Sequence, residues 1–220
     1  MKEDILEQLV EDWLVSEPGW FVKHNIKFRP SRRCKDYDSK RDSVHSDIDV
    51  LAISGCETGP ARVKVVTCKS WQGGFDPRKT QRILEGEATY NDRSEQFQKR
   101  EEWKYYRELV SQKWLSAFID KVESETGQRD FIYCIAVTRL RGKPSDREEL
   151  EKSEILRTRF LEAGSQMTLK LMPLEEIVQS LLSRQAEKLT TVLECTDIGR
   201  LLQLLNAAGI RLESNRTIGS

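Results

Sequence analysis

Two stretches of apolar sequence carry charged residues where an ordinary buried strand needs none: "SVHSDIDVLAIS" (43–54) and "ARVKVVTCKSW" (61–71). Each reads as a β-strand, and the intervening "GCETGP" has the composition of a hairpin connection. Side chains alternate between the two faces of a strand. We therefore expect Asp47 and Asp49 to share one face of the first strand, and Thr67 and Lys69 to share one face of the second. If the strands pair, carboxylates and an ammonium meet at one end of a sheet.

The elements around these strands indicate an α/β domain. Apolar spacing predicts helices over 2–15, 78–90, 94–123, 145–164, 174–185 and 196–209, and strands over 20–28, 130–140 and 167–174. The helix at 145–164 starts with a capping-box pattern and ends at Gly164. In the helix at 94–123 we expect Trp103, Tyr106, Val110, Trp114 and Phe118 to be core residues. We expect one domain over 1–175 and a helical C-terminal extension over 176–220.

Composition excludes several classes of protein. The 220 residues carry 36 basic and 36 acidic side chains, so net charge does not indicate a nucleic-acid binder. The chain lacks an apolar run of about 18 residues, so we expect no membrane segment, and the acidic, amphipathic N-terminus resembles neither a signal nor a transit peptide. A cytoplasmic location follows as the expectation. Five scattered cysteines without a CxxC pair argue against a zinc cluster or a disulfide framework.

The order helix, strand, Asp-bearing strand, Lys-bearing strand, helix, strand, with the text "SDIDVLAI … VKVVTCKSW", resembles the PD-(D/E)xK, or restriction-endonuclease-like, nuclease superfamily over roughly residues 3–140. The resemblance implies an α-β-β-β-α-β core with a mixed sheet flanked by helices. It also implies a metal-dependent endonuclease, with Asp49 as ligand of Mg²⁺ or Mn²⁺ and Lys69 orienting the attacking water. The backbone carbonyl of Cys68 would be a further ligand, and Glu7 or Glu11 would match the first-helix acid of the family.

Thr67 departs from that pattern, which places an acidic residue two positions before the lysine. A hydroxyl is a poorer ligand for Mg²⁺ than a carboxylate. Three explanations stay open. Asp47 supplies the second negative charge, or a glutamate on the following helix reaches back (Glu85 first, then Glu87). Alternatively, the site has lost catalysis and the fold serves as a nucleic-acid-binding or assembly module.

The segment 27–41, "KFRPSRRCKDYDSKR", is a local concentration of positive charge, which is either a solvated loop or a phosphate-binding one. For a nuclease, DNA is favoured over RNA, and the residues expected to contact phosphates are Arg29, Arg32, Arg33, Lys35, Arg78, Lys79 and Arg82. His24 and His45 are too few for a histidine metal site. "WQGGF" (71–75) lacks the spacing of a phosphate loop and reads as an ordinary loop. The apolar C-terminal helix is expected to pack on its own domain or to form a homodimer.

Overall fold

The strands form one five-stranded mixed sheet in the order β1-β2-β3-β4-β5. The computed structural model describes residues 4–84, 106–187 and 195–210. β1 and β2 pair antiparallel, as do β2 and β3, whereas β3, β4 and β5 run parallel. The strands are β1 (Trp20–Phe28), β2 (Ser46–Ser54), β3 (Val63–Lys69), β4 (Phe131–Val137) and β5 (Met167–Pro173). The expected strands are thus all present, and the general α/β architecture is confirmed.

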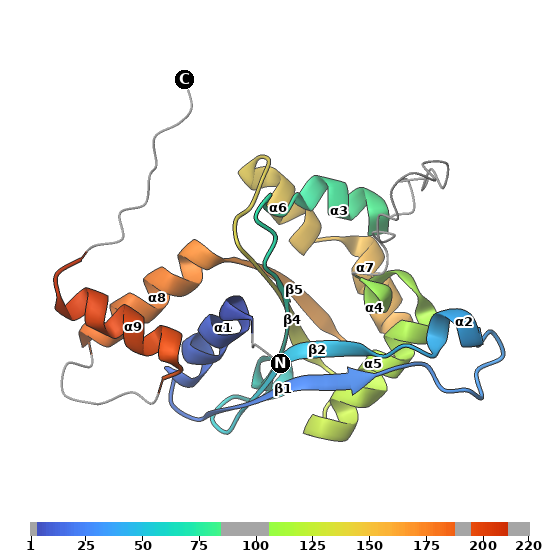
Figure 1. Cartoon of the computed structure of the whole chain (residues 1–220). Helices are drawn as coiled ribbons and strands as arrows, with labels where there is room; N and C mark the ends of the chain where they lie inside the picture. Colours follow the sequence, from blue (N-terminus) through green and yellow to red (C-terminus); the bar gives the residue numbers. More distant parts are fainter. Residues whose placement is uncertain (1–3, 85–105, 188–194, 211–220) are drawn as a thin grey trace.

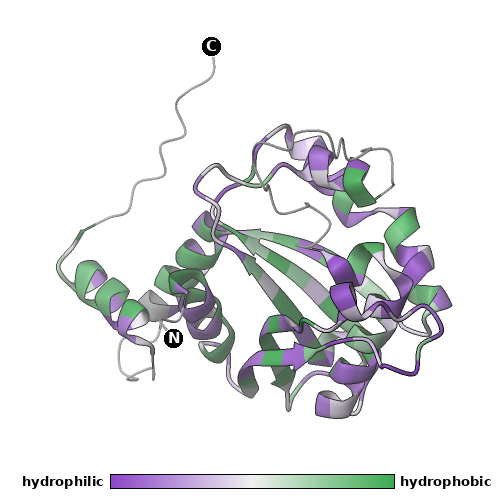
Figure 2. Cartoon of the chain, turned by 45° about the vertical axis from the view of Figure 1, so that its right-hand side comes forward, coloured by the Kyte–Doolittle hydropathy of each residue, from purple (hydrophilic) through white to green (hydrophobic). Residues whose placement is uncertain are grey.

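Helices cover both faces of the sheet, which gives three layers (Figure 1). Among the described residues the helical segments are α1 (Ile5–Val15), α2 (Ser39–Asp42), the 3-10 turn η1 (Gly59–Arg62), α3 (Pro77–Leu84), α4 (Arg107–Val110), α5 (Gln112–Thr126), α6 (Pro144–Glu151), α7 (Glu154–Glu162), α8 (Leu174–Glu187) and α9 (Asp197–Ala207). Helices α1, α8 and α9 lie on one face, and α4 to α7 lie on the other. Figure 2 shows the strands between them as mostly hydrophobic.

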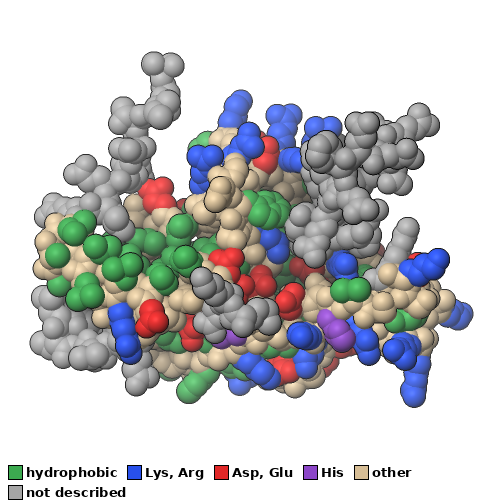
Figure 3. Space-filling view, viewed as in Figure 1, with side chains coloured by type: hydrophobic (Ala, Val, Ile, Leu, Met, Phe, Trp, Pro, Cys, Tyr) green, Lys and Arg blue, Asp and Glu red, His purple; other side chains and the backbone are tan. Residues whose placement is uncertain are grey.

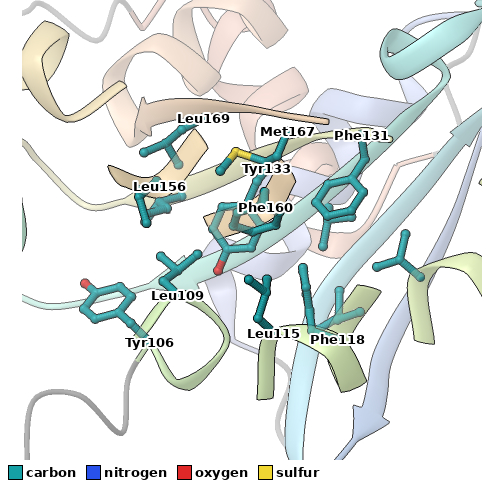
Figure 4. Close-up of a cluster of buried hydrophobic side chains, with 14 of the residues drawn as sticks. Tyr106, Leu109, Leu115, Phe118, Phe131, Tyr133, Leu156, Phe160, Met167 and Leu169 are labelled. Carbon is teal, nitrogen blue, oxygen red and sulfur yellow. The ribbon is translucent and has the colours of Figure 1, made fainter. Parts of the chain in front are cut away.

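Aromatic and aliphatic side chains pack together in the layer between the sheet and α5 (Figure 4). The ring of Phe118 lies 5.7 Å from those of Phe131 and Tyr133, and Phe160 of α7 lies 6.0 Å from Phe131, all edge to face. Such pairs add to the stabilisation that burial provides. Truncating a fully buried aromatic side chain such as Phe118 to alanine typically costs about 3–5 kcal/mol. Trp114 and Tyr106 are also buried, as expected, whereas Trp103 lies outside the described residues.

Two of the expected helices are interrupted. Ser111 has an extended backbone (φ −121°, ψ 119°) and separates α4 from α5, so the helix expected over 94–123 is not continuous. Ser153 separates α6 from α7, because its side chain accepts a hydrogen bond from the Leu156 N–H and caps the second helix. Helix α6 begins at Pro144 with Lys143 as its N-terminal cap, one residue before the expected start at Ser145. Helical periodicity continues through both breaks, which is why the sequence pattern does not reveal them.

The C-terminal helix α9 packs on its own chain. Leu202 is buried, and Ile198 contacts the cluster formed by α1 and α8. Asp12 of α1 fastens the start of this helix, since its carboxylate accepts hydrogen bonds from the N–H (2.7 Å) and the hydroxyl (2.8 Å) of Thr196. Leu201 and Leu204 remain exposed on the outer face. No helix in the described ranges has both the length and the apolar character needed to cross a membrane.

Candidate active site

The strands β2 and β3 stop pairing where the charged residues of both begin. Their ladder runs from Ile53↔Val63 to Val50↔Val66, and Asp49 is the next residue of β2. Its Oδ2 atom accepts the backbone N–H of Cys68 at 2.6 Å, so the Asp49 side chain stands where a strand partner would be. The N–H and C=O of one strand residue point to the same side. The Cys68 carbonyl therefore points to the side of β3 on which Asp49 lies.

Thr67 connects the carboxylate to the lysine. Its hydroxyl donates a hydrogen bond to Asp49 Oδ2 (3.1 Å) and accepts one from Lys69 Nζ (2.9 Å). The three side chains thus form a continuous chain, and Thr67 itself is buried. Burial raises the pKa of Asp49, while the charge of Lys69 and the Cys68 N–H oppose this shift and the charge of Asp47 adds to it. The structure therefore brings together Asp49, Thr67 and Lys69 as the sequence predicts.

The structure places a further carboxyl group in this region, Glu108, which is not among the acids expected from the sequence (Asp47, Glu85 and Glu87). Glu108 of α4 is buried, and its Oε1 accepts a hydrogen bond from the Tyr133 hydroxyl at 2.5 Å. Burial raises the pKa of Glu108, and its titration is also coupled to the charges of Lys69 and Asp49. Lys69 Nζ lies 5.9 Å from the ring centre of Tyr106, two residues before Glu108. Glu108 thus belongs to the electrostatic surroundings of the Asp49–Lys69 pair.

The sequence pattern does not indicate that Glu108 faces the sheet. In one continuous helix, a residue two positions from Tyr106 and two from Val110 would face away from the apolar stripe that these residues define. The break at Ser111 confines α4 to residues 107–110, and in that short segment Glu108 faces the sheet. The only local signal is an Arg-Glu pair flanked by large apolar or aromatic residues, in "YYRELV". The candidates Glu85 and Glu87 lie outside the described residues.

The two acids of the first helix have different surroundings. The charge of Glu7, like those of Asp49 and Asp4, contributes to the raised pKa of the Cys68 thiol, whose main cause is burial. Asp4 also accepts a hydrogen bond from the Ser70 hydroxyl at 2.7 Å. Glu11 instead lies 3.2 Å from His24 Nε2 on β1. Of the two, Glu7 is the one near the end of β3.

The alternation expected for Asp47 and Asp49 does not continue through this part of the sheet. Ile48 and Val50 are two apart, yet they belong to core clusters on opposite faces. On the neighbouring strand Asn25, between His24 and Ile26, has a left-handed backbone (φ 53°). This local twist leaves Asp47 exposed opposite Lys27, while Asp49 is partly buried. Asp47 acts on Asp49 through its charge.

The expected phosphate-binding residues form two separate groups. Arg29, Arg32, Arg33 and Lys35 are exposed on the loop before α2, and Arg78, Lys79 and Arg82 are exposed on α3. Figure 3 shows acidic side chains gathered in the middle of one face, with Lys and Arg above them and near the α2 end. Asp42 anchors the α2 end, since it accepts hydrogen bonds from Trp114 Nε1 (3.1 Å) and lies 2.7 Å from Lys113 Nζ. His45 is exposed.

The oxygen donors at the end of β3 suit a hard cation. Asp49 offers a carboxylate and Cys68 a carbonyl, and Mg²⁺ characteristically uses one or two carboxylates while it keeps several waters. Across the part of the chain that the structure describes, no group of three or more His, Cys, Asp or Glu side chains is placed to hold a metal ion. The donor set thus fits a cation that relies on water and substrate oxygens. It does not fit a closed protein cage.

Comparison with known proteins does not assign the chain to a family. No family model matches it, and neither a curated protein nor a solved structure with significant similarity was found.

Proposed function

We propose that the chain is a metal-dependent endonuclease that hydrolyses DNA phosphodiester bonds with an altered PD-(D/E)xK site. The observation that carries the proposal is the hydrogen-bonded chain from Lys69 through Thr67 to Asp49, formed where β2 and β3 separate. The element order α1-β1-β2-β3, followed by helices and β4, is the order expected for a restriction-endonuclease-like core. This proposal assigns the charged ends of the two strands to one catalytic function.

In this site Asp49 and the Cys68 carbonyl would hold Mg²⁺ or Mn²⁺, and Glu7 would add negative charge beside the end of β3. The bound cation would polarise the phosphate and lower the pKa of a water. Lys69 would orient the attacking water and stabilise negative charge on the phosphate oxygens. Water oxygen bonds to phosphorus as the bond to the leaving oxygen breaks, and a proton ends on that leaving oxygen.

Thr67 and Glu108 together would replace the missing acid of the motif. Thr67 fixes the amine of Lys69 relative to Asp49 by two hydrogen bonds. Glu108 would provide the second carboxyl group, from the helical segment α4 after β3, and burial raises the pKa of this group. This is the arrangement in which the acid comes from a following helix, with Glu108 as the described residue that fits it. Thr67 and Glu108 are positioning residues in this proposal.

Two observations favour a second candidate function. Thr67 stands where the motif has an acidic residue. The described residues also contain no group of three or more His, Cys, Asp or Glu side chains placed to hold a metal ion. Both features favour a catalytically degenerate nuclease fold that binds nucleic acid or assembles with a partner, including a second copy through the exposed Leu201 and Leu204 of α9. Cleavage assays separate this function from the first.

The test uses supercoiled plasmid and single-stranded DNA, each with Mg²⁺, with Mn²⁺ and with chelator. Wild type should nick or linearise DNA only with metal, and Asp49→Ala should abolish cleavage. Asp197→Ala, which removes an exposed acid at the start of α9, is the matched control and should cleave normally. Absence of cleavage by wild type, with gain of cleavage in Thr67→Glu, would establish the degenerate function. Metal-independent cleavage would contradict both.

A further inference from the structure

The loops that follow β3 and β4 are joined to each other beside the candidate site. Phe75 and Leu140 form an isolated parallel bridge. The Phe75 N–H donates to the Arg139 carbonyl (2.9 Å), and the Arg141 N–H donates to the Phe75 carbonyl (2.7 Å). The Thr138 hydroxyl also donates to the Trp71 carbonyl at 2.6 Å. The two loops therefore form one fixed unit at the sheet edge where Lys69 lies.

Gly74 determines where two arginine side chains lie on this unit. Its backbone is left-handed (φ 81°), and a Cβ atom there would lie 2.9 Å from Cγ of Arg139 and 3.0 Å from Cγ of Arg141. Both aliphatic stems thus pack over the glycine, on the same side of the loop. Any larger residue would displace the Arg139 stem, because Cβ contacts below 3.0 Å essentially do not occur, and would press against the Arg141 stem. Close packing of the two stems explains why a glycine is needed in "WQGGF".

The two guanidinium groups are available to a ligand. Arg139 and Arg141 are exposed, and neither forms an ion pair with another residue in the described ranges. Two positions along an extended backbone are about 6.7 Å apart, comparable to the separation of successive phosphates along one nucleic-acid strand. Arginine binds phosphate through a planar pair of N–H donors. Two arginines at this backbone spacing on one side of the loop therefore suit the phosphates of a nucleic-acid backbone.

Aromatic contacts connect this pair of arginines to the candidate catalytic lysine. The rings of Trp71 and Phe75 stack with their centres 6.3 Å apart, and the Tyr106 ring lies 6.4 and 6.5 Å from them. The Tyr106 ring centre also lies 5.9 Å from Lys69 Nζ. The loop unit is thus packed against the same side chains that surround Lys69, which keeps its position relative to the site constant.

We propose that Arg139 and Arg141, held over Gly74, form a phosphate clamp that fixes one strand of a nucleic acid beside Lys69. The clamp adds two contacts to those expected from α3 and from the loop before α2. The inference rests on the proposed function for its ligand, a nucleic-acid backbone, but not on catalysis. Binding and cleavage are therefore measured separately.

Binding is measured by fluorescence anisotropy with labelled duplex and single-stranded DNA, without divalent metal, in the Lys69→Ala background. Arg139→Ala/Arg141→Ala should weaken binding about tenfold or more. It should also lower the slope of log K against log salt by about 1.8 on duplex DNA, since each phosphate contact contributes about 0.9. Arg157→Ala/Arg200→Ala, which removes two positive charges from exposed positions on α7 and α9, is the matched control and should leave the slope unchanged.

A charge-conserving pair separates geometry from charge. Arg139→Lys/Arg141→Lys should keep most of the salt slope and still weaken binding, because lysine lacks the paired donors of arginine. Equal losses in the clamp and control variants, no loss in the clamp variant, or no DNA binding at all would each overturn the clamp. Displacement of DNA by poly-glutamate at equal charge would also overturn it, in favour of an acidic peptide. Loss of binding only in the clamp variant, with a wild type that does not cleave, would support the clamp and contradict the proposed catalysis.

Discussion

The hydroxyl of Thr67 lies 3.1 Å from Asp49 Oδ2, to which it donates, and it accepts a hydrogen bond from Lys69 in turn. A hydroxyl at this position can both donate and accept, whereas an ionised carboxylate accepts only. The residue that departs from the motif that the sequence resembles therefore joins the two residues that match it. Substitutions of Thr67 therefore test whether its hydroxyl contributes to the function of the site.

Replacing Thr67 by valine, which has nearly the same shape, removes both hydrogen bonds. We expect metal-dependent cleavage to fall about 10–100-fold, the range typical of groups that orient a metal ligand. Thr67→Ser keeps the hydroxyl and should keep most of the activity. The measurement is the single-turnover rate on a labelled duplex. Equal rates for Thr67→Val and wild type would show that the hydroxyl does not position Lys69.

Replacing Glu108 by glutamine should change how stability depends on pH. A glutamate ordinarily titrates near 4.5, and burial holds the pKa of Glu108 above this value in the folded protein. The folded state therefore binds this proton more tightly than the unfolded state. The resulting stabilisation is complete below pH 4.5 and is lost as pH rises through the folded pKa.

Urea unfolding from pH 4 to pH 8 measures this effect. The free energy of unfolding of wild type, relative to Glu108→Gln, should decrease as pH rises, because glutamine does not ionise and still accepts from Tyr133. Glu162→Gln, at an exposed position of α7, is the control and should follow wild type. A constant difference between wild type and Glu108→Gln across this range would contradict the raised pKa.

Replacing Asp12 by alanine should loosen α9. Its buried carboxylate accepts from both the N–H and the hydroxyl of Thr196, the residue that caps this helix. Loss of these bonds leaves half-buried donors without these partners, and we expect a cost in the lower part of the range of about 1–3 kcal/mol that applies to buried groups. Limited proteolysis should cut first near α9 in this variant, and Asp197→Ala should resist like wild type. Wild-type resistance in Asp12→Ala would show that apolar contacts alone hold the helix.

Replacing Asp42 by alanine should destabilise the α2 end and the basic loop before it. The carboxylate lies against Lys113 and Trp114, and breaking a buried ion pair from one side typically costs about 3–5 kcal/mol. Because the Lys113 side chain is partly exposed, we expect a cost in the lower part of that range. Guanidinium unfolding monitored by the fluorescence of Trp114 and the other tryptophans measures it. Asp36→Ala, at an exposed position, should have little effect.

The sequence predicts the strands and the Asp49–Lys69 pair well, since both depend on short-range patterns. Buried strands read as apolar runs, and a charged residue at the end of such a run stands out. Helix breaks at Ser111 and Ser153 are less visible, because apolar periodicity continues across them. The break at Ser111 matters most for Glu108, because the end of α4 determines which way the Glu108 side chain points.

Two other features depend on long-range geometry. The twist at Asn25 interrupts the alternation that Asp47 and Asp49 are expected to share. Arg139 and Arg141 become a pair at Gly74 only because the loops after β3 and β4 meet through Phe75. The sequence pattern within one segment therefore reveals neither the twist at Asn25 nor the packing of the two arginines over Gly74.

The most direct measurement of the central claim compares Lys69→Ala with Lys170→Ala in single-turnover cleavage of a labelled duplex with Mg²⁺. Lys170 is an exposed lysine on β5 of the same sheet, so both changes remove one positive charge from a strand. We predict that Lys69→Ala cleaves about 10²–10⁴-fold more slowly than wild type, the range for loss of a catalytic side chain, and that Lys170→Ala cleaves at the wild-type rate. Wild-type cleavage by Lys69→Ala would contradict the assignment of Asp49, Thr67 and Lys69 as one catalytic site.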